Sequence, residues 1–180
     1  MNKNLYLKIY EYFNSHIKMK RAINLLNNVF TCSVFLAYFA FLICLFIQKE
    51  EKLLVYVLIP AISFVVLSVF RYFYNAPRPY EKWTELKRGE NTKKGMSFPS
   101  RHTFSAFIIS FMFFDYCKLL GGVFLIISLL IALFRVLLLK HFLKDVLVSM
   151  ICAILINFAF IFFAWKIQIV VLYLIMCLGV

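Results

Sequence analysis

Three clusters of arginine, histidine and other polar side chains lie where long apolar runs begin or end. Ionisable residues near the ends of membrane helices are costly to place, so they are functional candidates by default. Arginine offers forked, permanently charged donors to phosphate oxygens, and histidine can attack phosphorus or protonate a leaving group. These residue types together indicate chemistry on a phosphate ester. The three clusters are Arg71 with Arg78; Ser100, Arg101 and His102; and Arg135, His141 and Asp145.

The spacing within the third cluster favours nucleophilic catalysis. Asp145 follows His141 by four residues, so the two side chains share one face if a helix starts there. A carboxylate in that position can hold the imidazole in one tautomer and leave its other nitrogen free to attack. With His102 as a second histidine, the chain offers both a nucleophile and an acid for the leaving alkoxide.

The second cluster predicts an anion site at the start of a helix. Pro99 suits the first helical turn and Ser97 is a possible N-cap, which would place free backbone N–H groups and the positive end of the helix dipole near the phosphate. No metal is expected, because the clusters supply only two histidines and one carboxylate and their arginines would repel a cation. No cofactor is predicted either.

The composition indicates that membrane helices position these residues. Of the 180 residues, 64% are hydrophobic and 16% are charged, and the mean hydropathy is +0.88, values that differ from those of soluble domains. The net charge is +12, and its basic residues lie between apolar runs rather than on a polar domain. We therefore expect a lipid phosphate substrate and membrane lipids as partners, with no nucleic acid and no obligatory protein partner.

Six apolar runs are predicted to cross the membrane, which gives an all-α, polytopic helix bundle. A spanning helix needs about 20 mostly apolar residues. Residues 1–21 mix apolar and basic side chains, which favours an interfacial amphipathic helix, with a disordered basic tail as the alternative. The predicted organisation is thus an interfacial segment over residues 1–21 and a membrane domain over residues 22–180. The six runs are residues 22–47, 53–74, 99–116, 121–139, 146–165 and a shorter one at 167–180.

This topology places all three clusters on one face of the membrane. The end of the second run, the start of the third, the end of the fourth and the start of the fifth must lie on the same side. The connections on the opposite side, residues 48–52 and 115–120, carry no histidine or arginine. A single polar site on one face is therefore predicted.

The three clusters resemble the signature of the type 2 phosphatidic-acid phosphatase superfamily of integral-membrane lipid phosphatases. That signature consists of Lys-x6-Arg-Pro, Pro-Ser-Gly-His and Ser-Arg-x5-His-x3-Asp. The order and the internal spacings agree, and the blocks extend over residues 71–145. In their place the chain has Arg71-x6-Arg78-Pro79, Pro99-Ser100-Arg101-His102 and Phe134-Arg135-x5-His141-x3-Asp145.

The resemblance implies a bundle of about six helices, metal-independent hydrolysis and a role for each residue. His141 resembles the nucleophile that becomes phosphohistidine, Asp145 resembles its orienting carboxylate, and His102 resembles the general acid. Arg78 and Arg135 resemble phosphate clamps, and Ser100 with the adjacent amides would complete the cradle. The residues expected to bind the substrate phosphate are Arg71, Arg78, Ser100, Arg101 and Arg135.

Three positions depart from the family signature. Arg71 replaces a lysine and keeps its positive charge, so we expect it still to bind phosphate. Arg101 replaces a glycine, and its side chain would either crowd the cradle or add another clamp. Phe134 replaces a serine and loses one possible hydrogen bond. None of these changes removes a residue that the chemistry requires.

The predicted activity is that of a membrane lipid phosphatase acting on a lipid phosphate or diphosphate. Plausible substrates are undecaprenyl diphosphate, phosphatidylglycerophosphate and phosphatidic acid. One alternative is a phosphotransferase of the same fold. Another is a catalytically silent protein that binds lipid phosphate, which the two histidines disfavour because a binder needs neither an acid nor a nucleophile.

Two arguments about membrane orientation conflict. The resemblance implies an extracytoplasmic active site. The positive-inside rule argues for a cytoplasmic one, because sixteen Lys and Arg residues lie on the side of the site and four on the other. Part of that excess could serve to attract anionic lipid. We expect the site to face the outside of the cell membrane, with the resemblance as the heavier argument.

Overall fold

The computed structural model describes residues 3–83, 85–86 and 94–178, with residues 161–178 described by their backbone only. All secondary structure in this part of the chain is helical, as predicted. The helices run in chain order as α1 Lys3–Ser15, α2 Ile17–Ile47, α3 Leu53–Tyr74, α4 Pro79–Lys82, α5 Arg101–Tyr116, α6 Lys118–Leu137 and α7 Leu143–Leu178.

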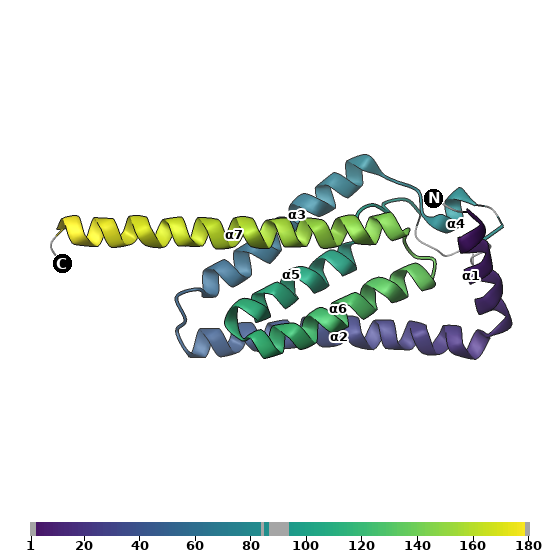
Figure 1. Ribbon diagram of the computed structural model, residues 1–180, viewed down its shortest axis with the longest axis horizontal. Coiled ribbons are helices and arrows are strands. Elements are labelled where there is room, and N and C mark those ends of the chain that lie inside the picture. The colour runs from purple at the N-terminus through teal and green to yellow at the C-terminus, as the bar shows by residue number, and fades with distance from the viewer. Residues whose placement is uncertain (1–2, 84, 87–93, 179–180) are drawn as a thin grey trace.

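Five long helices form a bundle in which consecutive members run in opposite directions (Figure 1). Four of them, α2, α3, α6 and α7, are long and apolar enough to cross a membrane, counting only described residues. Their outward faces carry exposed apolar side chains such as Leu36, Phe46 and Leu54. An apolar exterior of this extent suits contact with lipid. The fold is therefore the predicted polytopic membrane bundle.

Helix α5 is the centre of the bundle. It packs against α2, α3, α6 and α7. Ten of its sixteen residues are buried, among them Phe104, Ile108 and Phe113. Its length corresponds to roughly 24 Å, less than the thickness of a bilayer core. Because its neighbours surround it, α5 does not need the length of a lipid-facing helix.

A close turn connects α5 to α6. Cys117 alone separates the two helices, and a Cβ atom on Gly121 would lie 2.2 Å from the Cα of Phe114. Only glycine permits this approach, so Gly121 lies inside α6 as a packing residue. The predicted fourth run, which was expected to open at Gly121, instead begins as a helix at Lys118.

The prediction of separate fifth and sixth spans is wrong in its detail. Both runs belong to one continuous helix, α7, of 36 residues. Lys166 is the residue between the two predicted runs, but no glycine or proline lies between residues 143 and 178. A lone charged residue does not remove a backbone hydrogen bond as proline does. Charge alone therefore gave no reason for the helix to end.

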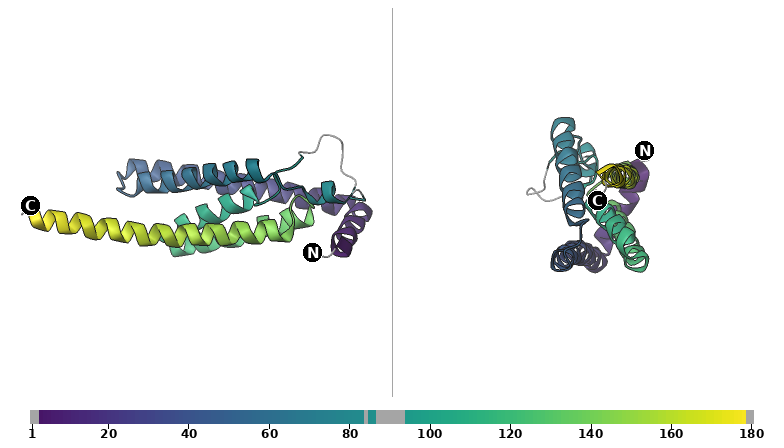
Figure 2. Two further views of the ribbon diagram at one scale, coloured as in Figure 1. Left: turned by 90° about the horizontal axis from the view of Figure 1, so that it is seen from above. Right: turned by 90° about the vertical axis from the view of Figure 1, so that its left-hand side faces the viewer.

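Helix α1 lies across the end of the bundle, beside α4 (Figure 2). Its residues Tyr6 and Phe13 are buried. The Tyr6 hydroxyl accepts a hydrogen bond from the backbone N–H of Leu143 at 2.9 Å. The Tyr6 ring packs on Trp83 and Phe142 at 5.2 and 5.6 Å between centroids. Residues 3–15 thus form a docked helix and not a disordered tail.

Candidate active site

The ends of α3 and α6 and the starts of α5 and α7 meet at the end of the bundle that α1 covers (Figure 1). All three clusters named from the sequence lie in these segments or in the loops between them. The topology thus brings the expected polar residues to one end of the molecule. No comparable group of arginine and histidine occurs in the described connection between α2 and α3 or at Cys117.

His141 lies in the short link between α6 and α7. Its side chain is 2% exposed, and its backbone N–H donates to the carbonyl oxygen of Arg135 at 3.2 Å. The Nδ1 atom lies 2.8 Å from the carbonyl oxygen of Ser97. Because a carbonyl only accepts, this contact requires the tautomer with the proton on Nδ1. The Nε2 atom then keeps its lone pair, which is the state that a nucleophile needs.

Asp145 lies next to His141, on the Nδ1 side of the imidazole ring. The Asp145 Oδ2 atom is 3.7 Å from His141 Nδ1, and it accepts hydrogen bonds from the Ser97 hydroxyl at 2.5 Å and the Phe142 N–H at 3.0 Å. The carboxylate is fully buried. It therefore acts on the imidazole mainly through Ser97 and through its charge, since its own contact with the ring is longer than a hydrogen bond.

Arg71 is placed differently from the expectation of a phosphate ligand. Its side chain is 3% exposed and donates to the carbonyl oxygens of Met96, Ser97 and Pro99. These bonds use the forked guanidinium to hold the segment that precedes α5. Since Ser97 in this segment also accepts from His141, Arg71 is connected to His141 through one residue.

Arg78 is fixed by the same segment from another direction. Its Nε donates to the carbonyl oxygen of Gly95 at 3.0 Å, and its backbone N–H donates to Glu81 at 2.7 Å. Glu81 also accepts from the Gly95 N–H at 2.9 Å. Gly95 has φ of +64°, and a Cβ there would lie 2.2 Å from the Asn75 side chain, so the position requires glycine. The remaining donors of the Arg78 guanidinium are those that could meet a phosphate.

The start of α5 differs in detail from the prediction. The helix begins at Arg101 with Ser100 as N-cap, so Pro99 precedes the helix and Ser97 is not the cap. The Ser100 N–H donates to the Ser149 hydroxyl at 2.6 Å and lies 3.1 Å from the carbonyl oxygen of Asp145. The physical reason is that Ser97 is already committed to Asp145 and His141.

The side chains of Arg101 and His102, the two residues after Ser100, lie in different surroundings. His102 is exposed at the first turn of α5 and lies within electrostatic reach of Arg135 and His141. The guanidinium of Arg101 lies over the ring of Phe64 on α3, 5.8 Å from its centroid. Its head is thus turned onto α3, so it does not crowd the buried Ser100.

Arg135 lies in the last turn of α6 and is 8% exposed. Its carbonyl oxygen accepts the N–H of Lys140 at 3.0 Å and that of His141 at 3.2 Å. Burial lowers the pKa of His141 to about 4; Asp145 opposes this shift, whereas the positive charges of Arg78 and Arg135 add to it. The imidazole is therefore neutral at pH 7, with two cations close enough to act on it.

Three residues that sequence reasoning did not assign to the site take part in its framework. Ser97 joins His141, Asp145 and Arg71 by hydrogen bonds. Ser149 accepts from Ser100 and donates to the carbonyl oxygen of Asp145 at 2.5 Å. Glu81 was too far in sequence from its partner at residue 95 to be paired with it. Of the three, only Ser97 had a signal in the sequence, because it lies two residues before the second block and is a possible N-cap.

The donor set of the site favours anions. Among the described residues, no three His, Cys, Asp or Glu side chains lie close enough together to hold a metal ion. The charged groups that act on His141 are instead two arginines and one carboxylate. Such an arrangement attracts a phosphate group and leaves it next to a neutral imidazole.

A family model described as the PAP2 superfamily matches residues 52–169, a segment that contains every one of these residues. The chain belongs to the PAP2 superfamily. The match covers more than half of the sequence, so the resemblance drawn from three short blocks is confirmed. No curated protein matches the chain significantly.

Two solved structures are similar to this PAP2 protein. LpxE of Aquifex aeolicus has 27% sequence identity and a TM-score of 0.61, and the match covers 81% of this chain and 93% of LpxE. A PAP2-type phosphatidylglycerolphosphate phosphatase of Bacillus subtilis has 20% identity and a TM-score of 0.60, with 91% and 94% covered. The second likeness shows the fold. The superfamily match, together with the likeness to LpxE, confirms the predicted class, a membrane lipid phosphatase.

Proposed function

We propose that this PAP2 protein removes the terminal phosphate of a lipid phosphate or diphosphate through a phosphohistidine on His141. The observation that carries the proposal is the 2.8 Å contact between His141 Nδ1 and the carbonyl oxygen of Ser97. It fixes the ring, selects the tautomer and leaves Nε2 as the attacking atom. A neutral His141 at physiological pH is the reactive form.

In the first step, Nε2 of His141 attacks phosphorus and the bond from phosphorus to the lipid oxygen breaks. His102 gives a proton to the leaving oxygen, so the lipid departs as an alcohol or as a lipid monophosphate. Because burial and the positive charge of Arg135 lower the pKa of His102 to about 3, this proton must arrive with the bound phosphate monoanion, whose remaining negative charge favours the protonated imidazole. The Asp145 carboxylate stabilises the positive charge that develops on the imidazole. Its Ser97 hydrogen bond at 2.5 Å keeps the carboxylate in place for this.

In the second step, water attacks the phosphohistidine. The now neutral His102 accepts a proton from this water, phosphate leaves, and both histidines return to their initial states. The same residue thus serves as acid and then as base. Its position at the exposed first turn of α5 lets water reach it.

Arg78, Arg135 and Ser100 are proposed to hold the phosphate during both steps. Arg78 and Arg135 supply charge next to the nucleophile, where the transition state concentrates negative charge on the phosphoryl oxygens. Arg71 is proposed to act as a positioning residue for the segment 96–99, because its guanidinium is committed to three carbonyl oxygens. No step requires a metal.

The proposed substrates are membrane lipids that end in a phosphate monoester or a diphosphate. Undecaprenyl diphosphate, phosphatidylglycerophosphate and phosphatidic acid all present such a group. The site would recognise the phosphate by charge and leave the lipid tail to the apolar faces of the helices. We also propose that the site faces the outside of the cell membrane.

Phosphate release from a panel of these lipids tests the proposal. We expect His141→Ala to abolish release while substrate binding persists, and His102→Ala to slow release about 100-fold or more. His16→Ala is the matched control, because His16 is an exposed histidine outside the site and its loss should leave the rate unchanged. Release should also persist in excess chelator. The mechanism would be contradicted if His141→Ala kept more than a few per cent of the activity. It would also be contradicted if chelator abolished phosphate release and added magnesium or zinc restored it.

A further inference from the structure

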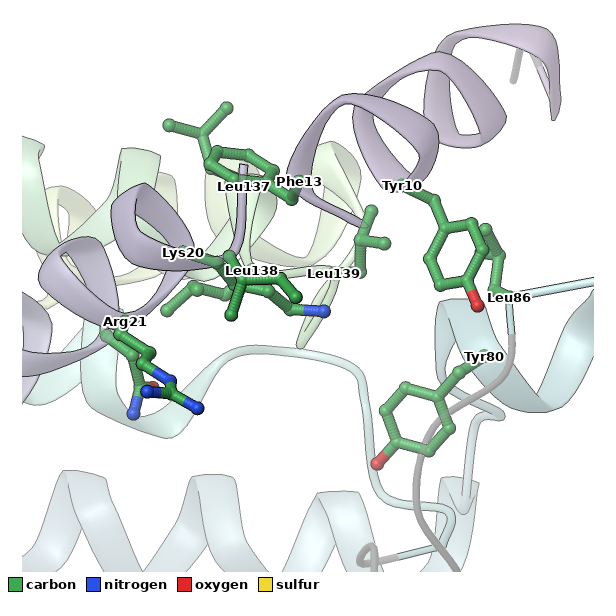
Figure 3. A pocket seen from close by; sticks show the side chains of 11 residues that line it. Tyr10, Phe13, Lys20, Arg21, Tyr80, Leu86, Leu137, Leu138 and Leu139 are labelled. Atoms are coloured by element: carbon green, nitrogen blue, oxygen red, sulfur yellow. The ribbon is translucent and has the colours of Figure 1, made fainter. Parts of the chain in front are cut away.

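A pocket with both polar and apolar walls lies at the same end of the bundle as the candidate active site. It has a volume of about 330 Å³ and is formed by α1, the start of α2, α4 and the end of α6 (Figure 3). Leu137, Leu138 and Phe13 are among its apolar walls, and Lys20 and Arg21 lie on one side of it. None of the catalytic or phosphate-binding residues proposed above lines this pocket.

Within the described part of the chain, no acidic side chain neutralises the charges at this pocket. No described residue that lines it is acidic. Arg21 is exposed and makes no hydrogen bond or ion pair with any described residue, and Lys20 reaches only the Asn14 amide oxygen, at 3.5 Å. Two cations beside an apolar wall are complementary to an anionic amphiphile, whose phosphate would meet the cations and whose chain would cover the leucines.

The pocket is also coupled to the loops that carry the catalytic groups. Leu138 and Leu139 immediately precede Lys140 and His141, and Tyr80 lies two residues after Arg78. Asn24, a further lining residue, accepts a hydrogen bond from Lys140 at 2.8 Å. An occupant would therefore contact the back of both loops while the catalytic side chains stay free.

We propose that this pocket binds one anionic phospholipid that is not a substrate and that holds the nucleophile link in its active geometry. The volume is at the lower end of the range for small-ligand pockets, so it accommodates a phosphate headgroup and the start of an acyl chain. The pocket lies beside α1, the helix predicted to rest in the membrane interface, which is the depth at which lipid headgroups occur. Phosphatidylglycerol suits this role because its phosphodiester has no terminal phosphate to release.

Native mass spectrometry of the detergent-solubilised full chain with phosphatidylglycerol or phosphatidylcholine tests this proposal. We expect one retained phosphatidylglycerol, no retained phosphatidylcholine, and a higher Tm with phosphatidylglycerol. The double variant Lys20→Gln/Arg21→Gln should weaken phosphatidylglycerol binding about 10-fold and abolish the rise in Tm. The control Lys8→Gln/Lys18→Gln removes the same charge from exposed positions outside the pocket and should bind as the unchanged chain does.

Turnover of a soluble phosphate ester in the same detergent gives a second measurement. Phosphatidylglycerol should raise kcat in the unchanged chain and in the control but not in the pocket variant. The lipid should also bind to His141→Ala, which separates failure of this proposal from failure of the catalytic one. Equal weakening in both double variants, equal retention of the two lipids, or displacement of phosphatidylglycerol by a competitive inhibitor of phosphate release would overturn the proposal. The last result would assign the pocket to the substrate.

Discussion

At the scale of single residues, His141 is oriented by a backbone carbonyl as much as by a carboxylate. The sequence predicted that Asp145 would share a helix face with His141, and the two do lie 3.7 Å apart, although His141 precedes α7. The shorter contact is with Ser97, 44 residues away in sequence. Spacing within one helix cannot reveal such a partner, because it depends on how the segment before α5 folds over the link before α7.

The pH dependence of the reaction follows from the burial of His141. Burial lowers the pKa of this imidazole to about 4, so it stays neutral and nucleophilic as the pH falls from 7 toward 5. An ordinary histidine would be half protonated near pH 6.5. We therefore expect no acid limb near pH 6.5 that is due to the nucleophile.

The measurement is kcat/KM against pH for two soluble phosphate esters whose own ionisations differ. Any loss between pH 7 and 5 should move with the ionisation of the ester. An acid limb near pH 6.5 that is identical for both esters would require a nucleophile with the pKa of a solvated histidine. Such a result would contradict the buried geometry described here.

At the scale of elements, the segment 95–100 connects the helices that form the site. Arg71 joins it to α3, Gly95 joins it to the Arg78 loop, and Ser100 joins it to α7 through Ser149. Misplacing a reacting group by about 1 Å can cost about 100-fold in rate. A change in this segment should therefore reduce turnover even where no phosphate contact is lost.

Substitutions of Arg71 test this connection. We expect Arg71→Ala to lower kcat about 100-fold, since three carbonyl oxygens lose their donor. Arg71→Lys should stay within about 10-fold of the unchanged enzyme, because an ammonium group offers three donors and keeps the charge. KM should change little in either variant if Arg71 acts on the loop. A large rise in KM with kcat preserved would instead assign Arg71 to direct phosphate binding.

The helices themselves were largely predictable, and their connections were not. Apolar runs identified α2, α3 and the start of α7 closely, because length and hydropathy decide whether a helix crosses a bilayer. The break expected at Lys166 was wrong, since a charge does not end a helix. The hydrogen-bonded partners of Arg71 and Arg78 could not be predicted, because they are backbone carbonyls and carry no signal in the residue types.

At the scale of the whole molecule, all of the proposed catalytic residues lie at one end of the bundle, so orientation in the membrane decides which lipids reach them. Single cysteines at Lys94 and Glu51 test the orientation, because both residues are exposed and lie at opposite ends of α3. In a cysteine-free background on intact cells, a membrane-impermeant thiol reagent should label position 94 and not position 51. Labelling at position 51 alone would place the active site in the cytoplasm, as the charge distribution suggests.

Trapping of the covalent intermediate is the most direct test of the mechanism. The chain is mixed with a substrate that carries a radiolabelled terminal phosphate and a leaving group that needs no proton, and the reaction is quenched in alkali, in which phosphohistidine is stable. His102→Ala should form the intermediate and accumulate it, because His102 is then missing only as the base for water.

The account predicts label on the peptide that contains His141, present in His102→Ala and absent in His141→Ala. The same label should be lost in acid. Turnover without any labelled peptide, or label that persists in His141→Ala, would show that phosphate is not transferred through His141 and would contradict the central claim.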